Sequence, residues 1–135
     1  MMAGRLAVPI HSPAGELLAY AGWRLDGEPG WKFPPKFERQ LELYNLHRAA
    51  EAVSEEGLVV VADILDVWRL AGVENVVALM NETMSDRQEA LIVSFAGGAQ
   101  RVTLVLPVGG RRDRLVARLA SQLFVRATDL SEFLA

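Results

Sequence analysis

The sequence contains no cysteine, and His11 and His47 are its only histidines. The absence of cysteine excludes disulfide bonds and zinc sites built on thiolates. Because only two imidazoles are present, a structural zinc site is not expected either. Any metal ion held by this chain would need oxygen ligands, and we expect no resident cofactor.

Long apolar runs are also missing. No apolar stretch reaches the roughly 18 residues that cross a bilayer, and residues 1–5 do not begin a signal peptide. We therefore expect a cytoplasmic protein that does not enter membranes. The chain has 135 residues, of which 51% are hydrophobic, so it is long enough to bury a proper core.

Acidic and basic residues lie in different parts of the chain. The net charge of -3 argues against a protein that simply coats nucleic acid. Residues 51–90 contain nine acidic side chains against two arginines. Residues 101–126 contain six arginines against one acid, Asp113. The C-terminal part therefore carries the positive charge that a phosphate-binding surface needs.

The most continuous apolar segment, residues 58–62, is followed at once by Asp63 and then by Asp66. An uninterrupted apolar run of this length predicts a buried central strand. In an α/β fold such a strand delivers its carboxyl end to the functional site. We therefore expect a site, if the protein has one, directly after this strand.

Strands and helices alternate from this segment onward. Ser85 and Gln88 have the spacing of a capping box, which places a helix start at Ser85. The expected strands are residues 58–62, 75–79, 101–106 and 124–128. The expected helices are residues 65–70, 85–95, 111–123 and 129–134. This alternation predicts an α/β fold, with a parallel sheet of about four strands and helices on both faces.

The N-terminal part has a different pattern. Two apolar runs, residues 6–10 and 17–24, flank a turn-rich stretch and predict a β-hairpin. The following stretch, residues 31–37, contains two adjacent prolines and is expected to be extended on the surface. Its candidate anchors are Trp31, Phe33 and Phe37.

A helix over residues 47–56, ended by Gly57, completes this part. We therefore expect an N-terminal region of hairpin, extended loop and helix over residues 1–56. An α/β domain is expected over residues 57–135.

Several short stretches, in the right order, resemble the catalytic core of bacterial DNA primases. Those similar to its N-terminal part are Val8-Pro9-Ile10, Tyr20-Ala21-Gly22-Trp23-Arg24 and Leu43-Tyr44-Asn45-Leu46-His47-Arg48-Ala49. Those similar to its Toprim domain, a fold shared with topoisomerases, are residues 58–61, Asp66-Val67 and residues 71–78. The chain also resembles small primase-like proteins of mobile elements. The resemblance covers nearly the whole chain and implies a Toprim-like fold and a role in DNA replication.

The Toprim resemblance implies a catalytic glutamate at the end of the first strand and a D-x-D pair at the end of the third. Such carboxylates hold Mg²⁺, which neutralises charge in phosphoryl transfer. In this sequence the three positions are Ala62, Pro107 and Gly109, and only Asp66 remains of the acidic set. Most of the negative field that attracts a divalent ion is therefore lost, and we expect a pseudoenzyme.

Asp63 is the one neighbour that could replace the lost glutamate. With Asp66 it could form a relocated Mg²⁺ site of a nucleotidyl transferase or nuclease. Otherwise Asp63 caps the helix that begins near Leu65, and Asp66 is a first-turn acid favoured by the helix dipole. Glu82 and Asp86 could add carboxylates to this crevice or could form a solvated acidic loop.

Four arginines mark the helix predicted over residues 111–123. Arg111, Arg114 and Arg118 fall on one side of this helix, and Arg112 lies at its start. This spacing can follow phosphates, although a solvated helix face would have the same pattern.

The N-terminal region supplies a second group of cations. Three of them lie close in sequence to Trp31 and Phe37, a combination suited to stacking on single strands. The aromatic side chains could equally anchor their own loop. The nucleic-acid-binding candidates of this region are Lys32, Lys36, Arg39 and Arg48.

Three functions fit these observations. The first is a pseudoenzyme that binds single-stranded DNA or RNA, or a replication protein, without making primers. The second is a Mg²⁺-dependent enzyme with Asp63 and Asp66 as ligands. The third is a protein-interaction module, without nucleic-acid binding, that uses Trp31, Phe33 or Trp68.

Overall fold

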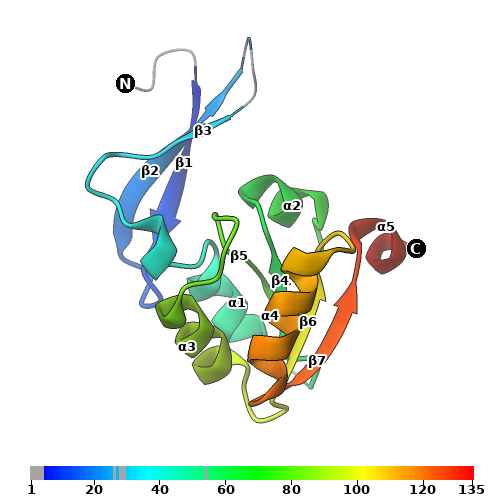
Figure 1. Ribbon diagram of the computed structural model, residues 1–135. Coiled ribbons are helices and arrows are strands. Elements are labelled where there is room, and N and C mark those ends of the chain that lie inside the picture. Colours follow the sequence, from blue (N-terminus) through cyan, green and yellow to red (C-terminus); the bar gives the residue numbers. More distant parts are fainter. Residues whose placement is uncertain (1–4, 26, 28–29, 54) are drawn as a thin grey trace.

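The computed structural model describes residues 5–25, 27, 30–53 and 55–135. These residues form two separate sheets (Figure 1). An antiparallel sheet of three strands lies at the N-terminal end, and a parallel sheet of four strands follows it. The predicted α/β fold with a preceding β-hairpin is confirmed.

The antiparallel sheet is built from β1 (Arg5–His11), β2 (Leu17–Arg24) and β3 (Trp31–Lys32). β1 and β2 form the predicted hairpin. β3 begins the stretch that we expected to be extended on the surface, but it also pairs with β2, with Trp31 opposite Trp23. The pairing stays short because the two prolines that follow have no amide hydrogen to donate.

The parallel sheet has the strand order β5–β4–β6–β7. Its strands are β4 (Leu58–Val61), β5 (Val76–Ala78), β6 (Arg101–Val105) and β7 (Phe124–Thr128). Every residue of β4 is buried, because β5 and β6 pair with its two edges and side chains cover both its faces. The predicted central strand is confirmed, and β7 lies at the edge of the sheet.

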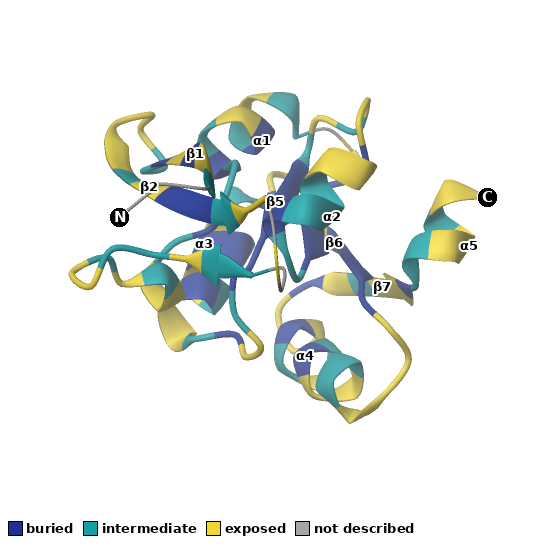
Figure 2. Cartoon of the chain, turned by 90° about the horizontal axis from the view of Figure 1, so that it is seen from above, coloured by how far each residue is buried: buried dark blue, intermediate teal, exposed yellow. Residues whose placement is uncertain are grey.

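The three longest helices share one hydrophobic cluster with a face of the parallel sheet. These are α1 (Leu46–Ala52), α3 (Asp86–Phe95) and α4 (Gly110–Ala120). They pack against side chains such as Val60 and Leu104, which point to this face and are fully buried. Figure 2 shows β5 and β6 of this sheet as mostly buried. Alternation along each strand sends the intervening residues to the opposite face.

The opposite face packs against two short helices, α2 (Ile64–Arg69) and α5 (Leu130–Leu134). Val61 of β4 belongs to this second cluster, together with Val8 and Ile10 of the antiparallel sheet. The N-terminal sheet therefore shares a hydrophobic core with the parallel sheet. The division of the chain into two domains at residue 56 stays a prediction.

Side-chain caps explain where two of the helices begin. The Ser85 hydroxyl accepts the Gln88 amide at 3.0 Å, and the Gln88 side chain accepts the Ser85 amide at 3.1 Å, so the predicted capping box is confirmed. Asp129 caps α5 by accepting the Glu132 amide at 2.8 Å. Gln88 is fully buried, and its side-chain amide donates to three backbone carbonyls, so its burial leaves no unpaired amide.

The helix predicted over residues 47–56 is shorter in the structure and ends at Ala52. Val53 is extended and packs against the core, which turns the chain toward β4. Gly57 then has a φ of +71°, and a Cβ at this position would lie 1.8 Å from the Arg101 carbonyl oxygen. Only glycine fits this turn. A 3-10 helix, Arg39–Leu41, is an addition to the predicted elements.

A membrane-spanning segment is not found among the helices of the described residues, since none of them is both long and apolar enough.

Candidate nucleic-acid interface

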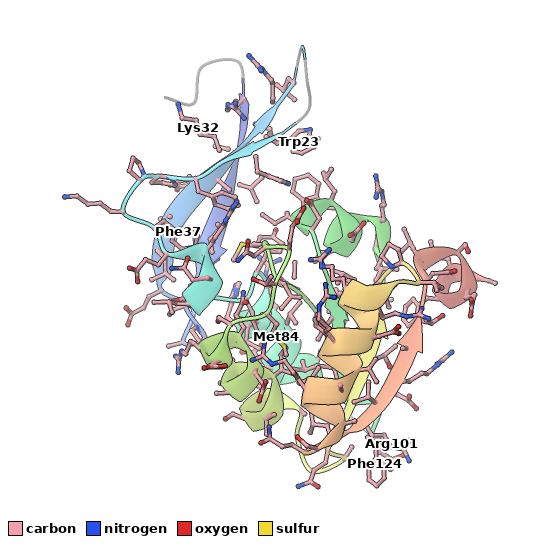
Figure 3. All side chains as sticks on the ribbon, in the orientation of Figure 1. Trp23, Lys32, Phe37, Met84, Arg101 and Phe124 are labelled. Carbon is pink, nitrogen blue, oxygen red and sulfur yellow. The ribbon has the colours of Figure 1, made fainter. Side chains whose placement is uncertain are left out.

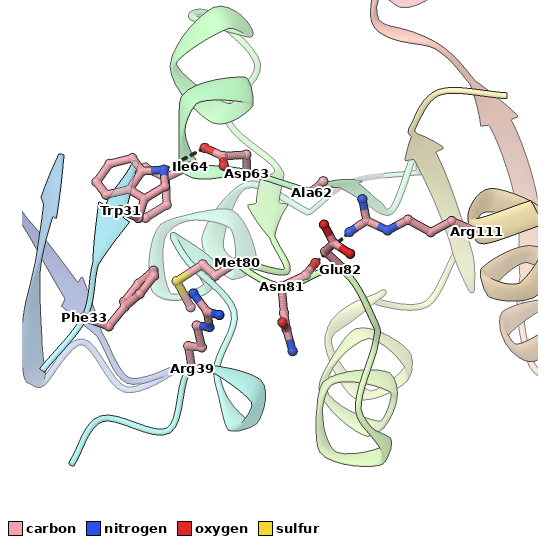
Figure 4. Close-up of a pocket in the computed structure, with 10 residues that line it drawn as sticks. All are labelled: Trp31, Phe33, Arg39, Ala62, Asp63, Ile64, Met80, Asn81, Glu82 and Arg111. Atoms are coloured by element: carbon pink, nitrogen blue, oxygen red, sulfur yellow. Dashed lines mark hydrogen bonds between the residues drawn. The ribbon is translucent and has the colours of Figure 1, made fainter. Parts of the chain in front are cut away.

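A pocket of about 320 Å³ lies where the carboxyl ends of β4 and β5 face the N-terminal sheet (Figure 4). It is the expected position for a site in an α/β fold. Two aromatic rings, two arginines and two carboxylates are among the side chains around it. The lining residues are Trp31, Phe33, Arg39, Ala62, Asp63, Ile64, Met80, Asn81, Glu82 and Arg111.

Asp63 connects the two sheets at the mouth of this pocket. Its Oδ1 accepts the indole Nε1–H of Trp31 at 2.9 Å and the Leu65 amide at 2.8 Å. The second bond makes Asp63 the N-cap of α2, so the capping role is confirmed. The Trp31 bond joins residues 32 positions apart, and nothing in the local sequence pattern indicates it.

One lining residue of the pocket occupies the position at which the primase resemblance places a glutamate. Here the residue is Ala62, whose methyl group supplies no charge. The Ala62 carbonyl accepts the Met80 amide at 2.9 Å, which extends the β4–β5 pairing. Met80 has a φ of 61°, a region that residues other than glycine rarely adopt. The backbone is thus strained beside the pocket, as at many functional sites.

Two arginines from distant parts of the chain meet at this pocket. The Arg39 guanidinium lies 4.8 Å from the centre of the Phe33 ring, in cation–π contact. Arg111 donates from Nη2 to the Asn81 carbonyl at 2.6 Å, whereas its Nε is buried without a hydrogen-bond partner in the described part of the chain. In Figure 4 the carboxylate of Glu82 points toward the Arg111 guanidinium. The pocket therefore holds one arginine against an aromatic ring and a second arginine beside Asn81 and Glu82.

Asp66 does not share this pocket with Asp63. It forms an ion pair with Arg69 at 2.9 Å and lines a different hollow of about 520 Å³, beside Pro107 and Asp129. Across residues 5–25, 27, 30–53 and 55–135, no group of three or more histidine, aspartate or glutamate side chains is arranged to hold a metal ion. The residues present do not fit the Mg²⁺ site that the Toprim resemblance implies.

The loop after β6 contains the other two positions of the lost acidic set. Pro107 lines the second hollow, and Gly109, with a φ of +155° that side chains rarely tolerate, precedes α4 without any side-chain cap. Asp129, across this hollow, accepts the Glu132 amide and a bond from Ser131, which lower the pKa of its carboxyl. These bonds belong to the cap of α5, so Asp129 does not replace the missing pair.

The arginines of α4 have different surroundings. Arg118 donates to the carboxylates of Glu89 at 2.8 Å and Asp86 at 3.0 Å, and also to the Met84 carbonyl. It therefore joins α4 to α3. Arg112 donates to the Leu106 carbonyl at 3.3 Å, and Arg114 is exposed. Of this predicted group, only Arg111 lines the pocket.

The remaining predicted cations are exposed. Lys32 and Lys36 project from the N-terminal sheet and the loop after it, and Arg48 lies on α1. Lys32, at the top of Figure 3, lies on the same sheet as Trp23. None of these three side chains lines the pocket, but two of them belong to the region that forms its aromatic wall.

A continuous set of aromatic contacts centres on Trp31. Its ring lies 4.9 Å from Trp23, 6.0 Å from Trp68 and 6.5 Å from Phe33, measured between ring centres. Phe33 in turn stacks on Phe37 at 6.0 Å. The predicted anchors of the extended stretch are therefore packed on one another, and Trp68 remains 39% exposed.

Comparisons with known proteins agree with this architecture. No protein-family model matches the chain. A DNA primase of Synechococcus elongatus is 29% identical over 134 residues, covering 94% of this chain and 19% of that protein. The chain therefore spans about one fifth of the length of this curated relative.

Solved structures show the same fold. The primase of Aquifex aeolicus, with its zinc-binding and RNA polymerase domains, superposes with a TM-score of 0.77 at 26% identity, covering 94% of this chain and 34% of that one. A DnaG primase catalytic domain bound to single-stranded DNA gives a TM-score of 0.73 at 22% identity, with coverages of 94% and 45%. The RNA polymerase domain of the Mycobacterium tuberculosis primase, in complex with double-stranded DNA, gives 0.72 at 22% identity, with coverages of 93% and 46%. The chain thus has the fold of the catalytic core of bacterial DNA primases, including a Toprim-like parallel sheet.

Proposed function

We propose that this chain is a primase-like core that binds single-stranded nucleic acid during DNA replication and does not synthesise primers. One observation carries the proposal. The pocket at the carboxyl end of the central strand keeps aromatic and cationic side chains, whereas alanine occupies the position of the catalytic carboxylate. Such a pocket is suited to holding a strand and is poorly suited to binding the metal ions of phosphoryl transfer.

Single strands are favoured over duplexes because of the aromatic surface. Bases of a single strand are free to stack on aromatic rings, and each such contact contributes about 1–3 kcal/mol. Trp31 and Phe33 form one wall of the pocket with Arg39 against Phe33, and Arg111 lies on the opposite side of the pocket (Figure 4). We propose that these two arginines contact phosphates. One of the similar primase structures holds single-stranded DNA, which supports the same mode for this chain.

The arrangement of the carboxylates supports the absence of catalysis. Asp63 already accepts two hydrogen bonds on one oxygen, and Asp66 is paired with Arg69 in a different hollow. The two carboxylates therefore line different hollows and do not face one shared site. Pro107 and Gly109 add no ligand from the neighbouring strand.

Binding is tested by fluorescence anisotropy of a labelled single-stranded oligonucleotide at several salt concentrations. We expect affinity to fall linearly with the logarithm of salt concentration. Each phosphate contact that is removed should reduce the slope by about 0.7. The most informative variant is R39Q, because the guanidinium that it removes lines the pocket against Phe33. K32Q and K36Q test exposed cations of the same N-terminal region.

The matched control is R87Q, an exposed arginine on α3 that does not line the pocket. It should leave the slope unchanged. Absent binding, or binding that does not depend on salt, would overturn the nucleic-acid proposal. The function then favoured would be a protein-interaction module that uses the exposed part of Trp68.

Catalysis is tested by primer synthesis on a single-stranded template with ribonucleotides and Mg²⁺ or Mn²⁺. We expect no primers. Primers that appear with the wild type and disappear with D63N or D66N would contradict the proposal and would establish the relocated metal site. Calorimetric titration with Mg²⁺ gives an independent readout, in which no binding at millimolar metal is expected.

A further inference from the structure

A second surface with nucleic-acid-binding character lies at the other end of the parallel sheet. We call it the Phe124 face and define it by Arg101, Phe124 and Arg126. Figure 3 shows Arg101 and Phe124 together at the bottom of the molecule, away from Lys32 and Trp23 at the top. This end holds the amino termini of β6 and β7, whereas the pocket described above lies at the carboxyl ends of the strands.

The strand register places the three side chains on one face. Arg101 is the direct neighbour of Phe124 across β6 and β7, and Thr103 is the neighbour of Arg126. Phe124 and Arg126 are two residues apart and therefore point to the same side of the sheet. The Phe124 ring therefore has Arg101 beside it on the neighbouring strand and Arg126 two residues along its own strand.

Among the described residues, the hollow that Phe124 lines contains no residue of α2 or α5. α5 comes nearer to Arg126, because its Phe133 lines a neighbouring hollow with Thr103 and Arg126. Phe124 is 73% exposed, and Arg101 and Arg126 are exposed as well. An aromatic side chain left this open on an edge strand is a liability for aggregation unless it has a ligand.

The two arginines are not engaged by the rest of the described chain. None of the ion pairs or side-chain hydrogen bonds found among the described residues involves Arg101 or Arg126. Arg118 shows the contrast, since its guanidinium is bound to two carboxylates and a carbonyl. Arg101 and Arg126 are therefore available to bind the phosphates of a nucleic acid.

The adjoining surface is hollowed, and Glu56 lines it together with the two arginines. Two shallow hollows, of about 210 Å³ and about 370 Å³, meet along this face. They share Glu56, Thr103 and Arg126 as lining residues. A flat aromatic ring with a guanidinium on the neighbouring strand is suited to stacking on a base.

We infer that the Phe124 face is a second binding site for single-stranded nucleic acid, with a base stacked on Phe124 and the adjacent phosphates held by Arg101 and Arg126. It lies outside the pocket on which the proposed function rests. A chain with two such sites would hold a longer strand than the pocket alone.

The test is photochemical cross-linking of the wild-type chain to an oligonucleotide of about 12 nucleotides that contains 5-iododeoxyuridine. Trypsin cleaves after Arg118 and Arg126, so the peptide of residues 119–126 contains Phe124 as its only aromatic residue. We expect a cross-link on Phe124. Cross-links confined to the aromatic wall around Trp31 would overturn this inference and leave the proposed function standing. A cross-link at Phe124 alone would support the inference and would show that the pocket of the proposed function does not hold the strand.

Equilibrium binding gives the second readout. F124A should weaken binding of the strand held at this face by about fivefold to a hundredfold, the range for loss of one stacked base. The double variant R101Q/R126Q should reduce the salt slope by about 1.4, the value for two phosphate contacts. All three residues are exposed, so these variants should fold normally, and R87Q is again the matched control.

The same variants distinguish nucleic acid from two other ligands of the Phe124 face, an acidic peptide and a second copy of the chain. An acidic peptide that binds in an F124A-sensitive way, when single-stranded DNA does not, would overturn the inference in favour of a protein ligand. Self-association that is abolished by F124A, measured by sedimentation without nucleic acid, would assign the face to a second copy and would also overturn it.

Discussion

The two sheets of this protein are stabilised by different kinds of side chain. The parallel sheet buries aliphatic residues on both faces, and Val60 and Leu104 have no exposed surface. The antiparallel sheet leaves Leu18 and Tyr20 43% and 48% exposed and relies on aromatic contacts around Trp31. The parallel sheet therefore supplies stability, and the N-terminal sheet supplies a contact surface whose position depends on a few specific bonds.

The largest expected effect is on the parallel sheet. L104A removes a fully buried side chain from the middle of β6 and should lower the free energy of unfolding by about 2–5 kcal/mol. L18A, the matched change on the N-terminal sheet, should cost much less because that side chain is 43% exposed and belongs to neither buried cluster. Urea denaturation of both variants measures the difference. Equal losses would contradict the division of roles between the sheets.

The next effect concerns the bond between the sheets. W31F keeps an aromatic ring but removes the indole donor to Asp63, a hydrogen bond to a charged acceptor that contributes about 1.5–3 kcal/mol. W68F removes a longer, 3.3 Å bond to the neutral Tyr44 hydroxyl and should cost less. Thermal unfolding followed by circular dichroism compares the two. If W68F were the more destabilising variant, the Trp31–Asp63 bond would not be the stronger of the two connections.

A smaller effect is expected at the helix that covers the parallel sheet. S85A removes the capping box of α3 and should cost about 1 kcal/mol. S12A removes a single exposed bond, to the Glu16 amide, in the turn of the N-terminal hairpin and should cost less than S85A. Denaturation midpoints would show the order, and a larger effect of S12A would refute it.

The smallest effect is a pH dependence where the two regions meet. Burial, together with the neighbouring His11 and Arg48, lowers the pKa of His47, while Glu51 acts in the opposite direction. The ring of His47 lies 4.4 Å from that of His11, the last residue of β1, and its Nδ1 is buried without a partner in the described part of the chain.

A folded-state pKa below the unfolded value means that the unfolded chain binds the proton more readily. The stability that depends on neutral His47 is therefore present above about pH 6.5 and is lost as the pH falls through the folded pKa. H47Q should flatten this part of the stability profile between neutral and mildly acidic pH. Parallel profiles for the wild type and H47Q would show that burial of His47 has no such consequence.

Local patterns predict most of the fold. The apolar run at residues 58–61, the Ser85–Gln88 spacing and the alternation after residue 58 each specify an element through its own sequence. The end of the helix at Ala52 and the pairing of β3 do not follow from local sequence, because Val53 and Trp31 respond to neighbours that are distant in the chain.

The candidate site was less predictable for the same reason. The substitution of the acidic set by Ala62, Pro107 and Gly109 is visible in the sequence once the resemblance is drawn. The meeting of Arg39 with Arg111, and the bond from Trp31 to Asp63, require the three-dimensional fold. Arg118 has the helical spacing of a phosphate contact, but its partners Asp86 and Glu89 lie on another helix.

The most direct test of the account is the affinity for single-stranded DNA with Mg²⁺ and with EDTA, at one ionic strength. A pocket that holds the strand by arginines and aromatic rings needs no metal, so we predict equal affinities in the two buffers. Binding that disappears in EDTA and returns with Mg²⁺ would show that carboxylates such as Asp63 still hold a metal ion, and it would contradict the central claim.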